Sequence, residues 1–196
     1  FHGAKLNLQA GAPVAPKSLN VSAVGGKHKG VGFLTDTPAR PMSQTWSTEA
    51  WNDGRFHIAC FAINRRWIQG AVMYGHAANP DMTATRQATD LICQEATTRL
   101  VEQSTGLRFI AGDFNQEDGI LESMRHWADQ GWVNIQSWAF QKKGVAIRPT
   151  CKNKTTKDHV FVSPELALYL ESVLVDDTYF KDHAILAARF RSEERR

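Results

Sequence analysis

Apolar and polar residues alternate along two neighbouring stretches of the chain, residues 56–62 and 67–73, with Asn64-Arg65-Arg66 between them. A period of two is typical of strands that bury one face, so we predict that these stretches pair as a β-hairpin. A further strand is predicted over residues 30–35. Residues 1–29 are rich in Gly, Pro, Ala and Ser and show little periodicity, so we expect them to be irregular.

Residues 83–103 contain neither Pro nor Gly, and their apolar positions recur at the spacing of one helix face. This pattern predicts a helix, for which Asp81 or Thr83 can serve as the N-cap. Residues 107–112 follow as a strand that is too apolar to have a solvated face. Such a strand is expected in a sheet that is covered on both sides.

Shorter elements complete the pattern. We predict a helix over residues 120–130, a turn or helix at 164–166, and strands over 160–162, 170–175 and 184–190. Strands and helices mixed in this order predict a layered α/β domain in which sheets form the core. We expect this single domain to span residues 1–196.

Composition narrows the class of protein. Hydrophobic residues make up 42% and charged residues 22% of the 196 residues, near globular averages, and no apolar run approaches the ~18 residues that span a bilayer, so we expect no membrane association. The three cysteines form no CxxC pair, which favours a reducing, intracellular compartment, with the nucleus as one candidate. The first residues lack an initiator Met and a signal-peptide pattern, so we interpret the chain as N-terminally truncated or processed.

The predicted strand 107–112 leads into Asp113-Phe114-Asn115. On extended backbone, side chains two residues apart project to the same side, so Asp113 and Asn115 would present a carboxylate and an amide to one substrate oxygen or water. The alternative is a strand-to-loop turn in which both side chains cap their own backbone.

Two Asp-His pairs precede later strands: Asp158-His159 lies before residues 160–162, and Asp182-His183 before residues 184–190. An imidazole can give or take a proton near neutral pH. A separate carboxylate fixes its tautomer, and Asp158 is the candidate for that role beside His183. With Asp113, these segments predict metal-assisted attack of water on a phosphate ester.

The net charge is only +3, but residues 141–157 contain no acid and are expected to form a loop. The cations of this segment are Lys142, Lys143, Arg148, Lys152, Lys154 and Lys157. Such a segment would attract a polyanion, and we predict that the first five of these residues bind substrate. A solvated loop without a ligand is the alternative.

Several motifs occur in an order known from one family. Residues 110–115 read Ile-Ala-Gly-Asp-Phe-Asn, residues 158–163 read Asp-His-Val-Phe-Val-Ser, and residues 181–183 read Lys-Asp-His. Upstream lie Gly-Val-Gly-Phe-Leu at 30–34 and Val-Met-Tyr at 72–74, followed by Asn79-Pro80. With these motifs the chain resembles the endonuclease/exonuclease/phosphatase superfamily, which includes abasic-site and retrotransposon endonucleases, deadenylases and phosphoinositide phosphatases.

The resemblance implies a four-layered α/β sandwich with two packed mixed β-sheets flanked by helices. It also implies that Asp113 activates water or assists the leaving oxygen, that Asn115 and Tyr74 contact the phosphate, and that His183, oriented by Asp158, contacts the phosphate or transfers a proton.

Asp182 would lie near a catalytic Mg²⁺ or Mn²⁺ by the same resemblance. We therefore expect a monomeric, metal-dependent DNA endonuclease, with a retroelement as one candidate origin. DNA is favoured over RNA because the basic segment and several tryptophans could track a backbone and stack on bases.

Two features depart from the family. Its first strands, which carry an Asn and a metal-binding Glu, are not recognisable, and residues 8–10 read Leu-Gln-Ala, where the methyl group of Ala10 cannot bind Mg²⁺. Within the later motifs, His159 replaces the usual aromatic residue and Lys181 the usual Ser. Two alternatives therefore stay open: a catalytically inactive or weakened nucleic-acid-binding remnant, and a phosphomonoesterase or lipid phosphatase on the same scaffold.

Overall fold

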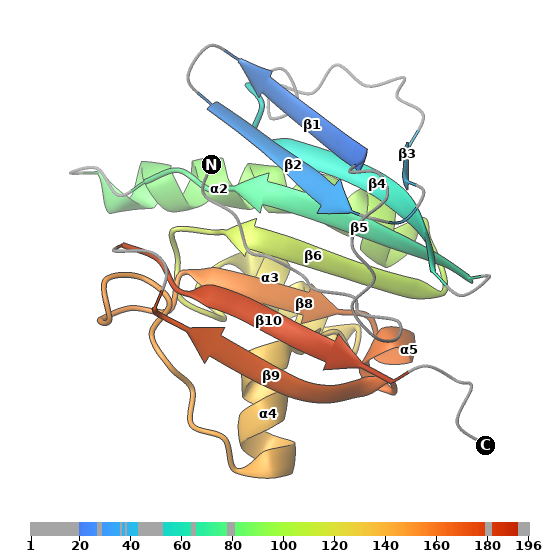
Figure 1. Cartoon of the computed structure of the whole chain (residues 1–196). Helices are drawn as coiled ribbons and strands as arrows, with labels where there is room; N and C mark the ends of the chain where they lie inside the picture. The colour runs from blue at the N-terminus through green and yellow to red at the C-terminus, as the bar shows by residue number, and fades with distance from the viewer. Residues whose placement is uncertain are drawn as a thin grey trace.

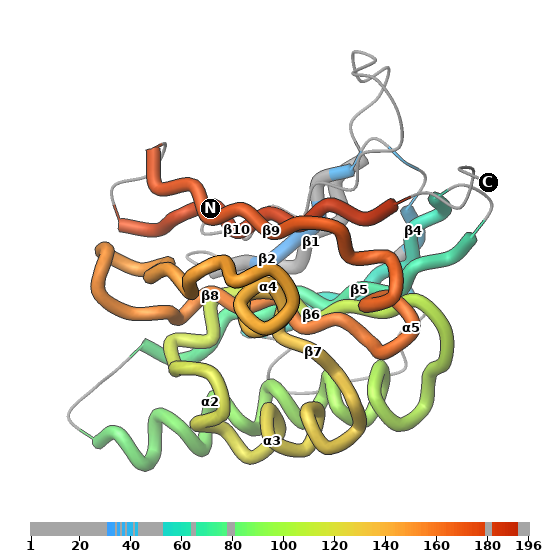
Figure 2. The backbone as a smooth tube through the Cα atoms, turned by 90° about the horizontal axis from the view of Figure 1, so that it is seen from below, coloured from blue at the N-terminus to red at the C-terminus, as the bar shows by residue number. Residues whose placement is uncertain are grey.

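The described residues form three successive layers: helices, a central β-sheet and a layer of β-hairpins (Figure 2). The computed structural model describes residues 20–26, 29–35, 37, 39–42, 53–63, 66–77, 81–178 and 182–191. The predicted α/β sandwich of packed β layers with flanking helices is confirmed, whereas the fourth layer of the expected four-layered sandwich is not seen among the described residues. In the described part of the chain, the second β layer consists of two separate antiparallel pairs.

The central sheet has six strands in the order β3-β4-β5-β6-β8-β7 (Figure 1). Their bounds are Ala39–Pro41 for β3, Phe56–Ile63 for β4, Arg66–Tyr74 for β5, Leu107–Asp113 for β6, Val133–Asn134 for β7 and Asp158–Val162 for β8. The predicted hairpin is confirmed as the antiparallel pair β4–β5. The sheet is mixed because β5 and β6 run parallel, whereas β6 and β8 run antiparallel.

Strand β6 is covered on both faces, as its apolar sequence predicts. Ile110 packs into the core cluster beneath the helices, whereas Phe109 and Ala111 pack into the cluster beneath the hairpins. Both clusters contain fully buried aliphatic side chains. The two cores fix the sheet from both sides, so the end of β6 is held on a rigid support.

The helical layer contains α2 (Met82–Ala96) and α3 (Glu122–Asp129), both predicted. Asp81 is the N-cap of α2, because its carboxylate accepts the N–H of Ala84 at 2.9 Å. The predicted helix 83–103 ends differently from expectation, since Thr97–Glu102 forms a π-helical turn, η1. Among the described residues, every helix is too short or too polar to cross a membrane.

The hairpin layer pairs β1 (Asn20–Gly26) with β2 (Lys29–Thr35), and β9 (Leu170–Asp176) with β10 (Ile185–Phe190). Strands β2, β9 and β10 are as predicted. The prediction of irregular structure over residues 1–29 is wrong for residues 20–26, because backbone pairing with β2 orders this stretch despite its small residues. Residues 1–19, with the Leu-Gln-Ala motif at 8–10, lie outside the described residues.

Two further helices follow the sheet: α4 (Ile135–Lys143) and the short α5 (Pro164–Ala167). Helix α4 was not predicted, and its last turn includes Lys142 and Lys143, which we expected in a loop. Its buried residues include the polar Gln136, whereas the apolar Phe140 is exposed, so the sequence shows no clean apolar face. The helix begins at the N-cap Asn134 and ends at Gly144, which adopts the left-handed conformation that favours glycine.

Candidate active site

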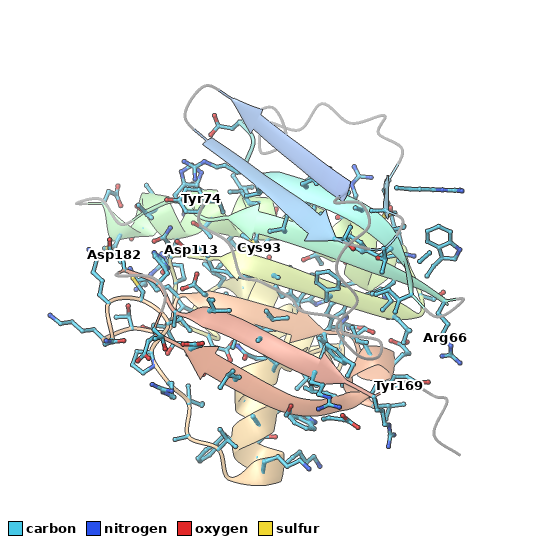
Figure 3. The ribbon with its side chains drawn as sticks, viewed as in Figure 1. Arg66, Tyr74, Cys93, Asp113, Tyr169 and Asp182 are labelled. Atoms are coloured by element: carbon cyan, nitrogen blue, oxygen red, sulfur yellow. The ribbon has the colours of Figure 1, made fainter. Side chains whose placement is uncertain are left out.

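The ends of three adjacent strands place polar side chains in one row. Tyr74 of β5 lies beside Asp113 of β6 in the sheet register, and Asp113 lies beside Asp158 of β8. Cross-strand neighbours project to the same face of a sheet. Ala111 and Val160, two residues away on β6 and β8, pack into the core beneath the hairpins, so the row faces the hairpin layer. Figure 3 shows Tyr74 and Asp113 at this end of the sheet.

His183 reaches the row from the hairpin layer, just before β10. Its Nδ1 lies 3.0 Å from Oδ2 and 3.3 Å from Oδ1 of Asp158. Ligand atoms of Asp113, Asp158 and His183 all lie within 4.8 Å of one another. Three distant chain segments therefore meet at one point, as the two Asp-His motifs and the end of β6 predict.

The Asp158–His183 pair is arranged for proton transfer. Asp158 is 5% exposed and His183 is half-buried, so the carboxylate is fixed while the ring stays accessible. With Nδ1–H donating to Asp158, the tautomer is set by geometry, and Nε2 is the atom that can exchange a proton with water or substrate.

Burial, and after it the negative charge of Asp158, raise the pKa of Asp113 from its ordinary value to about 6. The N–H of Asn115, which donates to Asp113 Oδ1 at 2.9 Å, and the charges of His183 and Lys157 act in the opposite sense. Asp113 can therefore hold or release a proton near neutral pH.

The prediction that Asp113 and Asn115 project to the same side of one strand is wrong. Strand β6 ends at Asp113, and Asn115 has φ of 54°, so the two side chains do not follow one extended backbone. The carboxylate of Asp113 caps the backbone of Asn115, as the alternative turn interpretation predicts. The amide Nδ2 of Asn115 instead donates across to the carbonyl of Gly75 at 3.2 Å, which ties this turn to the end of β5.

Solved structures of other proteins share this architecture. An AP endonuclease from Archaeoglobus fulgidus superposes with a TM-score of 0.65 at 15% identity, over 89% of this chain and 80% of its own. An endonuclease/exonuclease/phosphatase family protein from Leptotrichia buccalis gives 0.57 at 15% identity, over 91% and 74%. The chain has the endonuclease/exonuclease/phosphatase fold. A 3′ phosphatase from Neisseria, solved with a product DNA hairpin, gives 0.58 at 18% identity, over 88% and 80%. No protein-family model and no curated protein matches the sequence.

The row at the end of this endonuclease/exonuclease/phosphatase fold has the donors that a divalent cation requires. The carboxylates of Asp113 and Asp158 are oxygen donors of the kind that hard divalent cations bind, and His183 lies beside them with its Nδ1 hydrogen-bonded to Asp158. A cation would also relieve the repulsion between Asp113 and Asp158. Asp182 is exposed and lies outside this group of three, and its carbonyl accepts the N–H of Lys152 at 2.9 Å, so its metal role stays a prediction.

The basic segment divides into three parts in this fold. Lys142 and Lys143 lie at the C-terminal end of α4, at the bottom of Figure 1, away from the row. Arg148 donates to the carboxylate of Asp177 and to the carbonyl of Val175, each at 3.0 Å, so it is tied to the end of β9, and its role in substrate binding stays a prediction.

The remaining lysines of the basic segment return to the row. Residues 144–157 run back from the end of α4 to the edge that carries Asp113 (Figure 1). Lys152 and Lys154 are exposed in the 151–155 turn, and this turn pairs with His183 through Cys151. The structure therefore brings these two predicted substrate-binding residues to the site.

Lys157 was predicted as a cation of the basic segment but not as a residue of the site, where it directly precedes Asp158 and lowers the pKa of Asp113. Two further residues at the site were not predicted from the sequence. Arg55 is 8% exposed, donates to the carbonyls of Tyr74 and Gly75 at 3.2 and 3.1 Å, and lies 5.2 Å from the centre of the Tyr74 ring. Thr150 is buried between the segments of the site, and no local sequence pattern indicates that it belongs there.

Proposed function

We propose that the protein is a metal-dependent phosphodiesterase that cleaves nucleic acid. The observation that carries this proposal is the convergence of Asp113, Asp158 and His183 within 4.8 Å at the sheet edge. Hydrolysis of a phosphodiester needs a proton acceptor for water, a proton donor for the leaving oxygen and positive charge near the phosphoryl oxygens. The site offers a candidate for each.

The roles follow from the local environments. Asp113, with a pKa of about 6, accepts the proton of the attacking water or returns one to the leaving oxygen. His183, held by Asp158, exchanges a proton through Nε2 or donates to the phosphate. Tyr74 and Asn115 are proposed to donate hydrogen bonds to the phosphate. A bound Mg²⁺ or Mn²⁺ supplies positive charge beside the phosphoryl oxygens.

Nucleic acid is the substrate class that the surface favours. Lys152 and Lys154 are exposed in the turn that pairs with His183 through Cys151, where they would neutralise phosphates that flank the scissile bond. DNA is preferred over RNA because a 3′ phosphatase of the same fold was solved with a DNA hairpin. Cleavage within a strand is our proposal for the mode of attack.

Nicking of supercoiled plasmid tests this function. We expect nicking that requires Mg²⁺ or Mn²⁺ and stops in EDTA, and we expect Asp113→Ala and His183→Ala each to lower its rate at least about 100-fold. Asp129→Ala and His126→Ala on α3 are matched controls from the helical layer and should retain the rate.

Each other outcome points away from the proposal. Nicking that survives Asp113→Ala or His183→Ala would remove the assigned site. A wild-type chain that binds plasmid but never nicks it would support the inactive remnant. Release of phosphate from a phosphoinositide headgroup, without nicking, would support the phosphatase.

A further inference from the structure

We propose that Thr150 is the positioning residue that holds Asp158 against His183. The inference rests on the proposed function, because it concerns the pair assigned to proton transfer. Thr150 is 1% exposed, and its hydroxyl Oγ1 accepts two backbone N–H groups, from Lys157 at 3.0 Å and from Asp158 at 2.9 Å. A single oxygen thus fixes the backbone at the start of β8.

The backbone of Thr150 binds the other half of the pair. Its carbonyl accepts the N–H of Ala184, the residue after His183, at 2.8 Å. Two residues on, the N–H of Lys152 donates to the carbonyl of Asp182 at 2.9 Å, and Cys151 pairs with His183 between them. One side of Thr150 therefore holds the segment of Asp158, and the other holds the segment of His183.

This link matters because the two segments belong to different layers. In the described part of the chain, β8 pairs with β6 and β7, whereas β10 pairs with β9. The sheet ladders place Asp158 beside Asp113 but do not set the position of His183. The bonds through Thr150 align the two layers at the point where the imidazole meets the carboxylate.

The Thr150 hydroxyl can be removed without changing the volume of the side chain. Thr150→Val keeps the shape but leaves the N–H groups of Lys157 and Asp158 without this acceptor, which allows the start of β8 to move. Thr150→Ser loses a methyl group but keeps the oxygen. The pair of variants separates the hydrogen bonds of Thr150 from its packing.

Steady-state cleavage of a short DNA substrate tests the inference. We expect Thr150→Val to lower kcat by 10- to 100-fold with KM changed less than about three-fold, because the reacting groups and not the substrate contacts are displaced. Thr150→Ser should recover kcat to within about three-fold of wild type. A Thr150→Val enzyme with wild-type kcat would overturn the inference.

Thr97→Val is the control for a merely structural threonine. The Thr97 hydroxyl donates to the carbonyl of Cys93 at 3.0 Å and accepts from Trp127 Nε1 at 2.7 Å, within the helical layer. This variant should lower Tm and leave kcat unchanged. If Thr150→Val does not fold, Thr150→Cys, with a weaker acceptor, replaces it in every comparison.

A double-mutant cycle identifies the route through which Thr150 acts. In an Asp158→Asn background, Thr150→Val should lower kcat by less than about two-fold, because the pair is already broken. A full additional loss in that background would contradict a role through Asp158.

A long-range ¹H–¹⁵N spectrum of the histidine rings measures the tautomer of His183, so it tests the effect of Thr150 on the Asp158–His183 pair without an activity assay. We expect the Nδ1–H form of His183 in wild type and Thr150→Ser, and its loss in Thr150→Val. An unchanged His183 spectrum in Thr150→Val would overturn the inference even if the chain does not cleave DNA. Cleavage that survives His183→Ala would instead overturn the proposed function.

Discussion

Asp113 is a carboxylate that the fold buries beside a second carboxylate. It is 7% exposed, and its neighbour in the register is Asp158, which is 5% exposed. Two buried like charges cost free energy, which protonation or a bound cation would relieve and which the Asn115 N–H, His183 and Lys157 offset in part. Asp113 therefore destabilises the folded protein wherever it is ionised and no cation is bound.

The pH dependence of stability should report this cost. The pKa of Asp113 rises from 3.8 to about 6 on folding, so between these values the folded state keeps a proton that the unfolded state releases. The free energy of unfolding therefore falls as pH rises from about 4 to about 6. The loss is about 3 kcal/mol, because each unit of pKa difference corresponds to about 1.36 kcal/mol. We expect Asp113→Asn to become more stable than wild type by up to that amount between about pH 4 and pH 7. Urea unfolding in EDTA measures the difference, and a difference that does not change with pH would contradict the assignment.

At the scale of elements, the site depends on the close approach of β5 to the turn after β6. A Cβ on Gly75 would lie 2.2 Å from the carbonyl oxygen of Phe114, so only glycine fits there. The same approach lets the N–H of Gly75 donate to the carbonyl of Asp113 at 2.7 Å and its carbonyl accept from Asn115. A residue without a side chain thus positions two predicted catalytic side chains.

Gly75→Ala should therefore destabilise the protein by about 2 kcal/mol or more and lower kcat, because backbone must move to admit the methyl group. Gly144→Asn is the control, since Gly144 has φ of 68° and nothing within 4 Å of an added Cβ, and asparagine tolerates that conformation. Thermal unfolding and nicking rates of both variants check this prediction. Wild-type stability in Gly75→Ala would show that the turn does not approach β5 so closely.

At the scale of the whole molecule, the positive charge is divided between two places. Lys152 and Lys154 lie in the 151–155 turn, which pairs with His183 through Cys151, whereas Lys142 and Lys143 lie at the end of α4. Both pairs consist of exposed lysines, so they have the same charge and differ only in where they lie. Their comparison separates phosphate contacts at the site from the general attraction of a basic protein for DNA.

The salt dependence of DNA binding should distinguish these pairs. We expect the double variant Lys152→Ala/Lys154→Ala to reduce the slope of log K against log salt by about 1.8, because each lost phosphate contact removes about 0.9. Lys142→Ala/Lys143→Ala should change the slope by less than half as much. Equal reductions by both variants, in fluorescence anisotropy titrations, would contradict binding at the 151–155 turn.

The local patterns predict most of the elements. Alternation marks β4 and β5, the Pro- and Gly-free run marks α2, and the apolar run marks β6 as a strand covered on both faces. The predictions fail for β1 and α4, where pairing with β2 and packing between layers outweigh weak local preferences. The prediction of extended backbone from Asp113 to Asn115 is also wrong. Asn115 has a left-handed backbone conformation, and its side chain donates to the carbonyl of Gly75, which is far away in the sequence.

The sequence by itself determined the strands next to Tyr74, Asp113 and Asp158, because strand periodicity is a local property of the chain. The tertiary structure alone decided which of the candidate site residues lie in contact with one another. It brought His183 to Asp158 across two layers, joined Thr150 to both, bound Arg148 to Asp177 and separated Lys142 from Lys152. Distances between layers depend on packing and on bonds between residues far apart in the chain, and no short-range pattern encodes them.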